Sequence, residues 1–190
     1  MLPALIFCIA TVSVLGQVYF YNRATRRLYN CNWNELFKQL ESIPRFTVAQ
    51  VGDEYLNPKA NQLGLEPEDI WREIGGLDGI RRMRRNARIL IALAAYAEHW
   101  NFTESVIVKE RMRQDALHLR LATLQISARM VLRIGRVRIA FHLQESVGAY
   151  HLMTKRLLTL YQHSHSGLYP RLAQVIGEDP FPDAHVLGTI

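Results

Sequence analysis

The stretch IRRMRRNARILIALAAYAEHW, residues 80–100, decides the fold because it joins an arginine cluster to an apolar block. Residues 81–88 contain five arginines, whereas residues 89–97 contain no charged side chain. A membrane span needs about 20 apolar residues, so this block of nine is too short to be one. A helix that is apolar on all sides is surrounded by neighbours, which predicts that this helix lies at the centre of a bundle.

Three long helices are predicted from this stretch onwards. Apolar residues recur at spacings of three and four over residues 79–100, about 102–134 and about 137–164. The predicted buried face includes Met112, Leu119, Ile126 and Met130 in the second helix and Leu143, Val147, Tyr150 and Leu157 in the third. Asn101 with Glu104 has the spacing of a capping box for the second helix, and Gly135 allows the chain to reverse after it. A continuous rod without that reversal would be about 90 Å long. We therefore predict an all-α fold with an antiparallel three-helix bundle over residues 79–165.

Two short helices and a linker are predicted in residues 23–78, the juxtamembrane segment. Residues 32–43 form an amphipathic pattern, with Asn32 or Asn34 as its cap and Pro44 as its stop. In residues 66–76, Pro67 suits a first helical turn and the double glycine at 75–76 suits a helix end.

Two further segments, residues 45–65 and 166–190, lack a long helical pattern. Residues 45–65 are predicted to be a linker, with one short extended piece at residues 47–51. Residues 166–190 are predicted to hold one short helix and a loose tail.

The N-terminal residues 1–22 have the features of a membrane anchor. Residues 2–21 carry no charge, which is enough helix to cross a bilayer core of about 30 Å. Aromatic and then basic side chains follow, as at a membrane interface: Tyr19, Tyr21, Arg23, Arg26 and Arg27. A cleaved signal peptide is the alternative, but no basic residue precedes the apolar run and no small residues mark a cleavage site after it. A buried core helix is the third interpretation.

Composition and charge suggest where such an anchor would sit. Arginine outnumbers lysine 19 to 4, which is typical of GC-rich coding and indicates a bacterial source. The arginines after the apolar run place the N-terminus outside and the remaining chain in the cytoplasm. We therefore predict a single-pass protein of the bacterial inner membrane with a cytoplasmic helical domain.

The arginine cluster is the candidate anion-binding or lipid-binding site. Residues 79–156 carry a net charge of +10, whereas the segments before and after them each carry −2. The candidates are Arg81, Arg82, Arg84, Arg85 and Arg88, with Arg111, Arg113, Arg133, Arg136 and Arg138 as extensions. Anionic lipid is the preferred ligand because an anchor would hold the cluster near a negative surface, and nucleic acid is disfavoured because no DNA- or RNA-binding motif accompanies it.

An internal ion-pair network is the competing interpretation of the same arginines. Five acids precede the cluster closely in sequence: Glu66, Glu68, Asp69, Glu73 and Asp78. The double glycine would let the short acidic helix fold back over the arginines.

Catalytic and metal-binding motifs are missing from the sequence. It contains no nucleophile elbow, P-loop, dinucleotide-binding glycine pattern or zinc-protease motif. His142 and Glu145 lie three residues apart on the third predicted helix, but a metal site in a bundle needs further carboxylates. His163 and His165 alone supply too few ligands. No metal or cofactor is expected.

The sequence therefore predicts a non-catalytic accessory subunit or scaffold of a membrane-associated complex, with an unidentified protein partner. A basic module for anionic lipid or nucleic acid is the alternative, and a metal-binding bundle is the third possibility.

Overall fold

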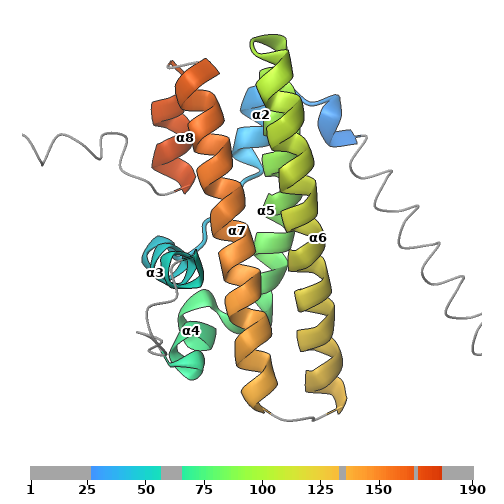
Figure 1. Ribbon diagram of the computed structural model, residues 1–190, viewed down its shortest axis with the longest axis vertical. Coiled ribbons are helices and arrows are strands. Elements are labelled where there is room, and N and C mark those ends of the chain that lie inside the picture. The colour runs from blue at the N-terminus through green and yellow to red at the C-terminus, as the bar shows by residue number, and fades with distance from the viewer. Residues whose placement is uncertain (1–26, 57–65, 133–135, 165–166, 177–190) are drawn as a thin grey trace, which may run out of the picture.

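The computed structural model describes residues 27–56, 66–132, 136–164 and 167–176, and every regular element among them is a helix (Figure 1). In chain order these are α2 (Trp33–Lys38), α3 (Arg45–Leu56), α4 (Pro67–Ile74), α5 (Gly76–Tyr96), the 3-10 helix η1 (Ala97–His99), α6 (Phe102–Leu132), α7 (Arg136–Ser164) and α8 (Tyr169–Ile176). The all-α prediction is confirmed. No helix in the described ranges has the length and apolar character to cross a bilayer. The predicted span, residues 2–21, lies outside those ranges.

The three long helices α5, α6 and α7 pack side by side, running up, down and up (Figure 1). Helices α6 and α7 form an antiparallel hairpin, as predicted, and do not join into one rod. The residues between them, 133–135, are outside the described part of the chain, so the predicted role of Gly135 is not observed. The predicted capping residue Asn101 is present at the start of α6, where its Oδ1 accepts the Glu104 N–H at 3.2 Å.

A tight turn between α4 and α5 depends on glycine. Gly75 ends α4 with φ +85° and Gly76 begins α5 with φ +62°, a region that other residues rarely adopt. Pro67 stands in the first turn of α4, where its missing N–H is not needed. The predicted helix at residues 66–76 is therefore confirmed, and α5 begins only two residues after α4 ends.

The predicted linker at residues 45–65 is wrong over its first part, and the extended piece at residues 47–51 is not observed. These residues lie in helix α3, which packs across α7. Val48 and Val51 are buried in this contact. Because helical stability in proteins comes mostly from tertiary packing, a segment with a weak local pattern becomes helical here. Residues 57–65 are outside the described ranges.

Helix α2 is shorter than predicted and belongs to the main core. It ends at Lys38, where the prediction placed the end at residue 43. Trp33 is buried, and its indole N–H donates to the Tyr161 hydroxyl at 3.1 Å. That hydroxyl in turn donates to the Leu93 carbonyl at 2.9 Å. The short helices therefore complete the bundle and do not merely connect it to the N-terminus.

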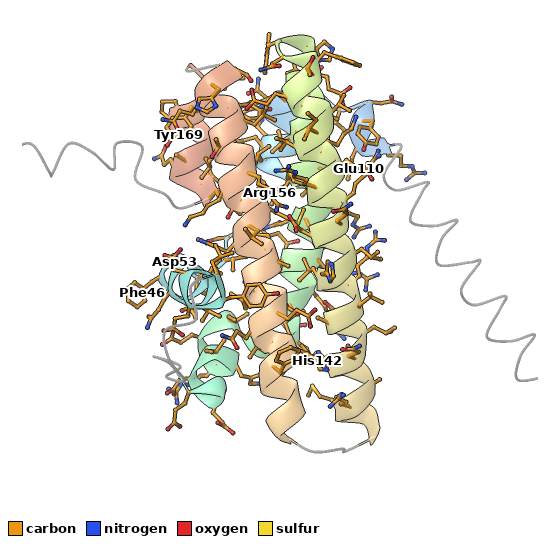
Figure 2. The ribbon with its side chains drawn as sticks, in the orientation of Figure 1. Phe46, Asp53, Glu110, His142, Arg156 and Tyr169 are labelled. Atoms are coloured by element: carbon orange, nitrogen blue, oxygen red, sulfur yellow. The ribbon has the colours of Figure 1, made fainter. Side chains whose placement is uncertain are left out.

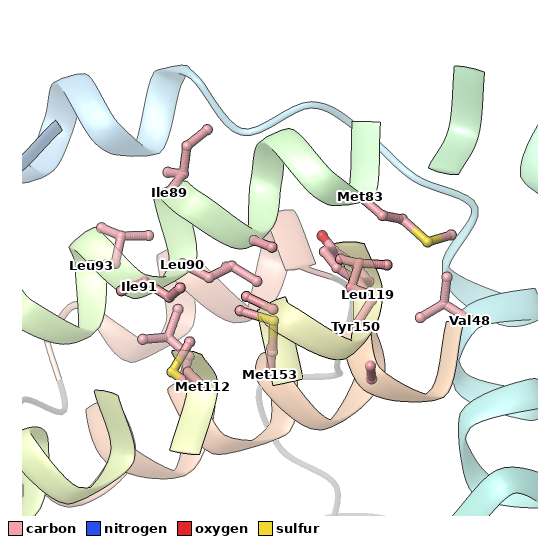
Figure 3. Close-up of a cluster of buried hydrophobic side chains, with 14 of the residues drawn as sticks. Val48, Met83, Ile89, Leu90, Ile91, Leu93, Met112, Leu119, Tyr150 and Met153 are labelled. Atoms are coloured by element: carbon pink, nitrogen blue, oxygen red, sulfur yellow. The ribbon is translucent and has the colours of Figure 1, made fainter. Parts of the chain in front are cut away.

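Helix α7 lies at the centre of the core and not at one corner of three helices. The prediction gave it one apolar face, but α3, α4, α5, α6 and α8 all pack against it. Ala149 and Leu158, which are off the predicted face, are buried as well. Figure 3 shows Met153 and Tyr150 of this helix among side chains of α5 and α6.

The predicted buried face of α6 fails at its distal end. Met112, Leu119 and Ile126 are fully buried, as predicted, whereas Met130 is 41% exposed. In Figure 1 the end of α6 and the start of α7 extend beyond the first turn of α5, so α5 does not cover the last turns of α6.

Candidate functional site

The arginine cluster occupies the outer side of the first half of α5. Arg81, Arg84 and Arg85 are exposed, and Arg82 and Arg88 are half-buried. Helical geometry places Arg81, Arg84, Arg85 and Arg88 on one side, because residues three and four apart share a face.

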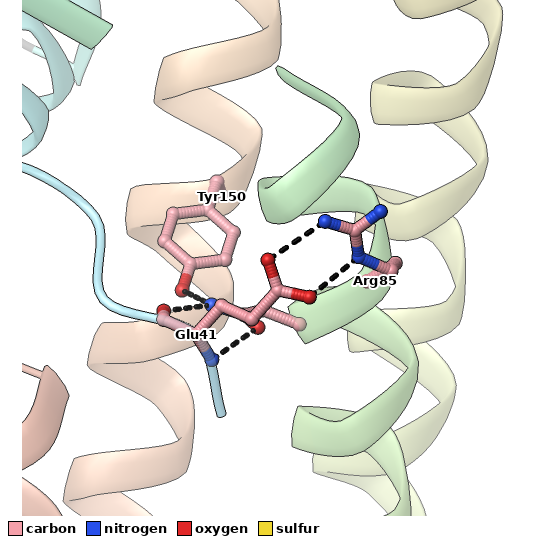
Figure 4. A network of polar contacts seen from close by, with 4 residues as sticks. Glu41, Arg85 and Tyr150 are labelled. Atoms are coloured by element: carbon pink, nitrogen blue, oxygen red, sulfur yellow. Dashed lines mark hydrogen bonds and ion pairs between the residues drawn. The ribbon is translucent and has the colours of Figure 1, made fainter. Parts of the chain in front are cut away.

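One arginine of the cluster is held by a carboxylate that is distant in sequence. Arg85 Nε and Nη2 donate to the two carboxylate oxygens of Glu41 at 2.6 and 2.7 Å (Figure 4). This hydrogen-bonded guanidinium holds the pKa of Glu41 below its usual range, although partial burial opposes it. Glu41 lies between α2 and α3, so the pair fastens that connection to α5.

Asn86, which adjoins Arg85, is buried and fixes the same connection. Its Oδ1 accepts the Glu41 N–H at 3.0 Å, and its Nδ2 donates to the Glu41 carbonyl at 2.7 Å and to the Tyr150 hydroxyl at 3.1 Å (Figure 4). Burial raises the pKa of Tyr150 to about 12, so this hydroxyl is neutral at physiological pH. The sequence analysis missed Glu41 and Asn86. Only the position of Asn86 on the otherwise apolar side of its helix pointed to a buried role.

The predicted internal network between the acidic helix and the arginines is largely wrong. Asp69 pairs with Arg72 of its own helix at 2.5 Å, and Glu73 accepts a hydrogen bond from the Thr47 hydroxyl. Asp78 contacts the cluster, through Arg81 at 3.0 Å. The remaining predicted acids, Glu66 and Glu68, are exposed. The turn at Gly75 directs α4 towards α3 and α7, which leaves its acids away from the arginines.

The other predicted basic and interfacial residues are only partly described. Tyr19, Tyr21, Arg23, Arg26 and Arg133 lie outside the described residues, and the side chains of Arg136 and Arg138 are not described. Arg27 begins the described chain. On α6, Arg111 is exposed, whereas Arg113 donates to Glu110 at 3.0 Å and to the Tyr29 hydroxyl at 3.4 Å.

The candidate metal pair His142–Glu145 gains one further histidine. Glu145 lies 3.4 Å from His142 Nδ1 and 3.8 Å from His118 Nδ1, which comes from α6. The contact with His142 lies within α7, whereas the contact with His118 crosses the hairpin (Figure 2 shows His142 between the two helices). Within the described part of the chain, no group of three or more His, Cys, Asp or Glu side chains is arranged to hold a metal ion. His163 lies 3.6 Å from Glu104, and His165 is outside the described residues.

A second polar cluster joins α3 to α7. Asp53 Oδ1 accepts a hydrogen bond from Lys155 Nζ at 2.9 Å and lies 3.3 Å from His151 Nε2. His151 is 4% exposed, and this burial, followed by the Lys155 charge, lowers its pKa despite the opposing effect of Asp53. His151 also lines a pocket of about 40 Å³ with Asn86, Tyr150 and Thr154. This volume suits a water molecule or two and is too small for an organic substrate.

A row of exposed leucines runs along the outer side of α6. Leu117, Leu121 and Leu124 are 54%, 48% and 61% exposed, and Gln114 and Ala128 continue the same row. We call these five residues the α6 stripe. Their spacings alternate between three and four, which is the period of a coiled-coil seam. Residues 114–128 cover about 21 Å of helix.

The α6 stripe was not predicted from the sequence because the inner row of the same helix already accounts for one apolar face. The inner row of α6 contains Met112, Ala116, Leu119, Ala122 and Ile126, and all five are buried against α5 and α7. Helix α6 contains more leucines than one buried face requires. This excess was the signal for a second apolar row.

Comparisons with protein families, with curated proteins and with solved structures gave no match to this chain.

Proposed function

We propose that this chain is a non-catalytic, membrane-anchored adaptor, which serves as an accessory subunit or scaffold and docks a helix of another protein on the α6 stripe. The observation that carries the proposal is the heptad-spaced exposure of Leu117, Leu121 and Leu124. Single exposed apolar residues are normal on a protein surface, whereas apolar residues that adjoin one another mark interaction sites.

Folding alone does not require these leucines. Helix α6 already buries a complete inner row, so its outer row adds apolar surface without contributing to the core. In an amphipathic helix that only covers a core, polar residues would occupy those positions. A second apolar row on the opposite side therefore suits a helix that has a partner on each side.

The membrane part of the proposal is supported by sequence. Residues 2–21 are uncharged, and arginines follow them at positions 23, 26 and 27. By the positive-inside bias this arrangement places the helical domain on the cytoplasmic side of a bacterial inner membrane. An adaptor held there would present the α6 stripe to other proteins of the same membrane.

A basic module for anionic lipid is the second candidate, favoured by the exposure of Arg84 and Arg81 on one side of α5. It has less support than the adaptor because Arg85 already forms a bidentate ion pair with Glu41, and Arg81 already forms an ion pair with Asp78. An anion would have to compete with carboxylates that are already in place.

The test of the adaptor is purification of the full-length chain in mild detergent, with the co-purifying proteins identified by mass spectrometry. The stripe variant Leu117→Ser/Leu121→Ser is compared with wild type and with the control variant Phe46→Ser/Leu56→Ser. The control removes two exposed apolar side chains from α3, and Phe46 points away from the helices (Figure 2). All three proteins should have the same circular dichroism spectrum.

We expect wild type and the control to retain one defined set of membrane proteins at high salt, and the stripe variant to lose it. Retention of the same set by the stripe variant would contradict the proposal. Recovery of only lipid or nucleic acid, lost at high salt, would favour the arginine cluster.

A further inference from the structure

We infer that the α6 stripe is covered by this chain's own uncharged residues 2–21, the N-terminal run, until that run enters a membrane. This inference rests on the proposed function and adds its regulation, because insertion of the run would uncover the stripe for the partner helix. Three features support it: where the described chain begins, how far the run can reach, and how much of the run a bilayer buries.

The described chain begins beside α6, at the Gln114 end of the stripe. The Tyr29 hydroxyl accepts a hydrogen bond from Arg113 Nη2 at 3.4 Å, and Leu28 packs against the core. Arg113 lies one helical turn before Leu117, and Figure 1 shows the first described residues next to the first half of α6. The N-terminal run therefore leaves the folded domain next to the exposed leucines.

The chain between Tyr29 and the N-terminal run is long enough to place the run on the stripe. The eight residues from Tyr29 back to Tyr21 span at most about 28 Å, whereas the whole stripe is about 21 Å long. As a helix, the run of 20 residues is about 30 Å long, so it can cover the stripe from end to end. The arrangement that needs the least connecting chain is antiparallel to α6, with Tyr21 near Gln114 and Cys8 near Ala128.

The N-terminal run and the stripe are both apolar surfaces that lack cover in water. The run has no charged residue, and Leu117, Leu121 and Leu124 are exposed on α6. Removal of apolar surface from water is favourable and needs no particular partner. A short connection holds two such surfaces at an effective concentration of about a millimolar, so they meet each other before they meet a separate protein.

A bilayer competes with the stripe for the same run and buries more of it. The stripe covers one side of a helix, whereas a bilayer core of about 30 Å surrounds a helix of this length on every side. The apolar area removed from water is therefore larger in the membrane. Since the run cannot occupy both places, its insertion leaves the leucines open. The adaptor would then bind its partner only after it has reached the membrane where that partner lies.

The test is disulfide cross-linking within the full-length chain, made by cell-free synthesis with or without vesicles of phosphatidylethanolamine and phosphatidylglycerol. Cys8 lies in the N-terminal run and supplies one thiol, and Cys31→Ser removes the other natural cysteine. A second thiol is introduced at either end of the stripe, by Ala128→Cys or Gln114→Cys, at positions that are both exposed. The disulfide formed under a mild oxidant is followed on a nonreducing gel.

Without vesicles, we expect Cys8 to cross-link to Ala128→Cys at least about tenfold faster than to Gln114→Cys, because a docked run raises the effective concentration at one position only. Leu117→Ser/Leu121→Ser should remove this difference, whereas the matched control Phe46→Ser/Leu56→Ser on α3 should keep it. With vesicles, the protein should move to the membrane fraction and the Ala128→Cys cross-link should be lost. Circular dichroism establishes that each variant is folded.

The outcomes separate this inference from the adaptor function. Equal rates at the two positions, or a difference that survives the leucine variant, would overturn the self-cover and leave the adaptor in place. A leucine-dependent cross-link between two chains would overturn it by assigning the stripe to a second copy. An intrachain cross-link that persists in the membrane fraction would overturn both the release of the stripe and the adaptor. If the cross-links behave as expected but the stripe variant keeps its co-purifying proteins, the adaptor falls while the self-cover stands.

Discussion

Gly52 of α3 lies directly against the ring of His151 of α7. A Cβ on Gly52 would come within 2.3 Å of His151 Cγ, much closer than atoms can pack. Further along the same pair of helices, a Cβ on Gly148 of α7 would come within 2.5 Å of Tyr55 Cδ1 of α3. Each helix therefore supplies a glycine to receive an aromatic side chain of the other, and this is how α3 lies so close to the centre of the core.

Gly52→Ala should destabilise the protein by about 1–3 kcal/mol, the usual cost of overpacking. His151 is 4% exposed and cannot turn towards solvent, so either its ring shifts into the adjoining small pocket or α3 moves away from α7, and both changes disturb the packing. Gly148→Ala should cost less, because Tyr55 is 40% exposed and its ring can turn towards solvent. Urea unfolding of both variants against wild type measures the two losses. A larger loss for Gly148→Ala would contradict this description of the contact.

Asn86→Ala should cost about 3 kcal/mol, because it leaves buried polar groups without partners. The side chain satisfies the backbone N–H and carbonyl of Glu41 and contacts the Tyr150 hydroxyl. Urea unfolding followed by circular dichroism measures the effect, with Gln162→Ala on the exposed side of α7 as control. An Asn86→Ala variant as stable as the control would show that water replaces these bonds without loss.

Folding stability should fall as the pH drops below about 6.5, the ordinary pKa of histidine. Burial lowers the pKa of His151 in the folded protein, so the unfolded chain takes up this proton at a higher pH. The stability is therefore fully present above that pH and declines below it. The pKa of Asp53 is also lowered, first by its hydrogen bond from Lys155, so its contribution is lost only below about pH 4.

His151→Gln tests this assignment, because glutamine does not titrate. Between about pH 7.5 and about pH 5.5, the unfolding free energy of this variant should change less with pH than that of wild type. Equal slopes for the two proteins would assign the pH dependence to other groups.

Arg85→Gln should lower the midpoint of urea unfolding slightly, whereas Arg84→Gln should leave it unchanged. Arg85 is tied to Glu41 by two hydrogen bonds, and Arg84 is exposed on the same turn. Both arginines are on the surface, so the effect of Arg85→Gln should diminish at high salt. Equal midpoints for the two variants would show that the Glu41 pair does not contribute to folding.

Deletion of residues 1–22 should move the protein from the membrane fraction to the soluble fraction. The deletion removes the uncharged run at residues 2–21 and leaves every helix described here intact. Fractionation followed by a carbonate wash makes the measurement. A truncated protein that remains in washed membranes would contradict the anchor.

Helix positions could be predicted from the sequence because their signals are local. Spacings of three and four residues predicted α5, α6 and α7, and Pro67 with Gly75 bounded α4. Helix α3 was not predicted because its signal is not local. Its buried residues Val48 and Val51 form too short a row to stand out, and its packing depends on Gly52 meeting a histidine that is 99 residues later in the chain.

The sequence by itself determined that the chain is helical, where most helices begin and end, and where its charge is concentrated, since each depends on neighbouring residues alone. Only the tertiary structure decided how the helices pack on one another and which surfaces they leave uncovered. It packed five other helices against α7, paired Arg85 with Glu41 across 44 residues, and left the α6 stripe exposed. A helix with two apolar rows can bury either one, and the buried row is the one that the neighbouring helices fit with a complementary shape.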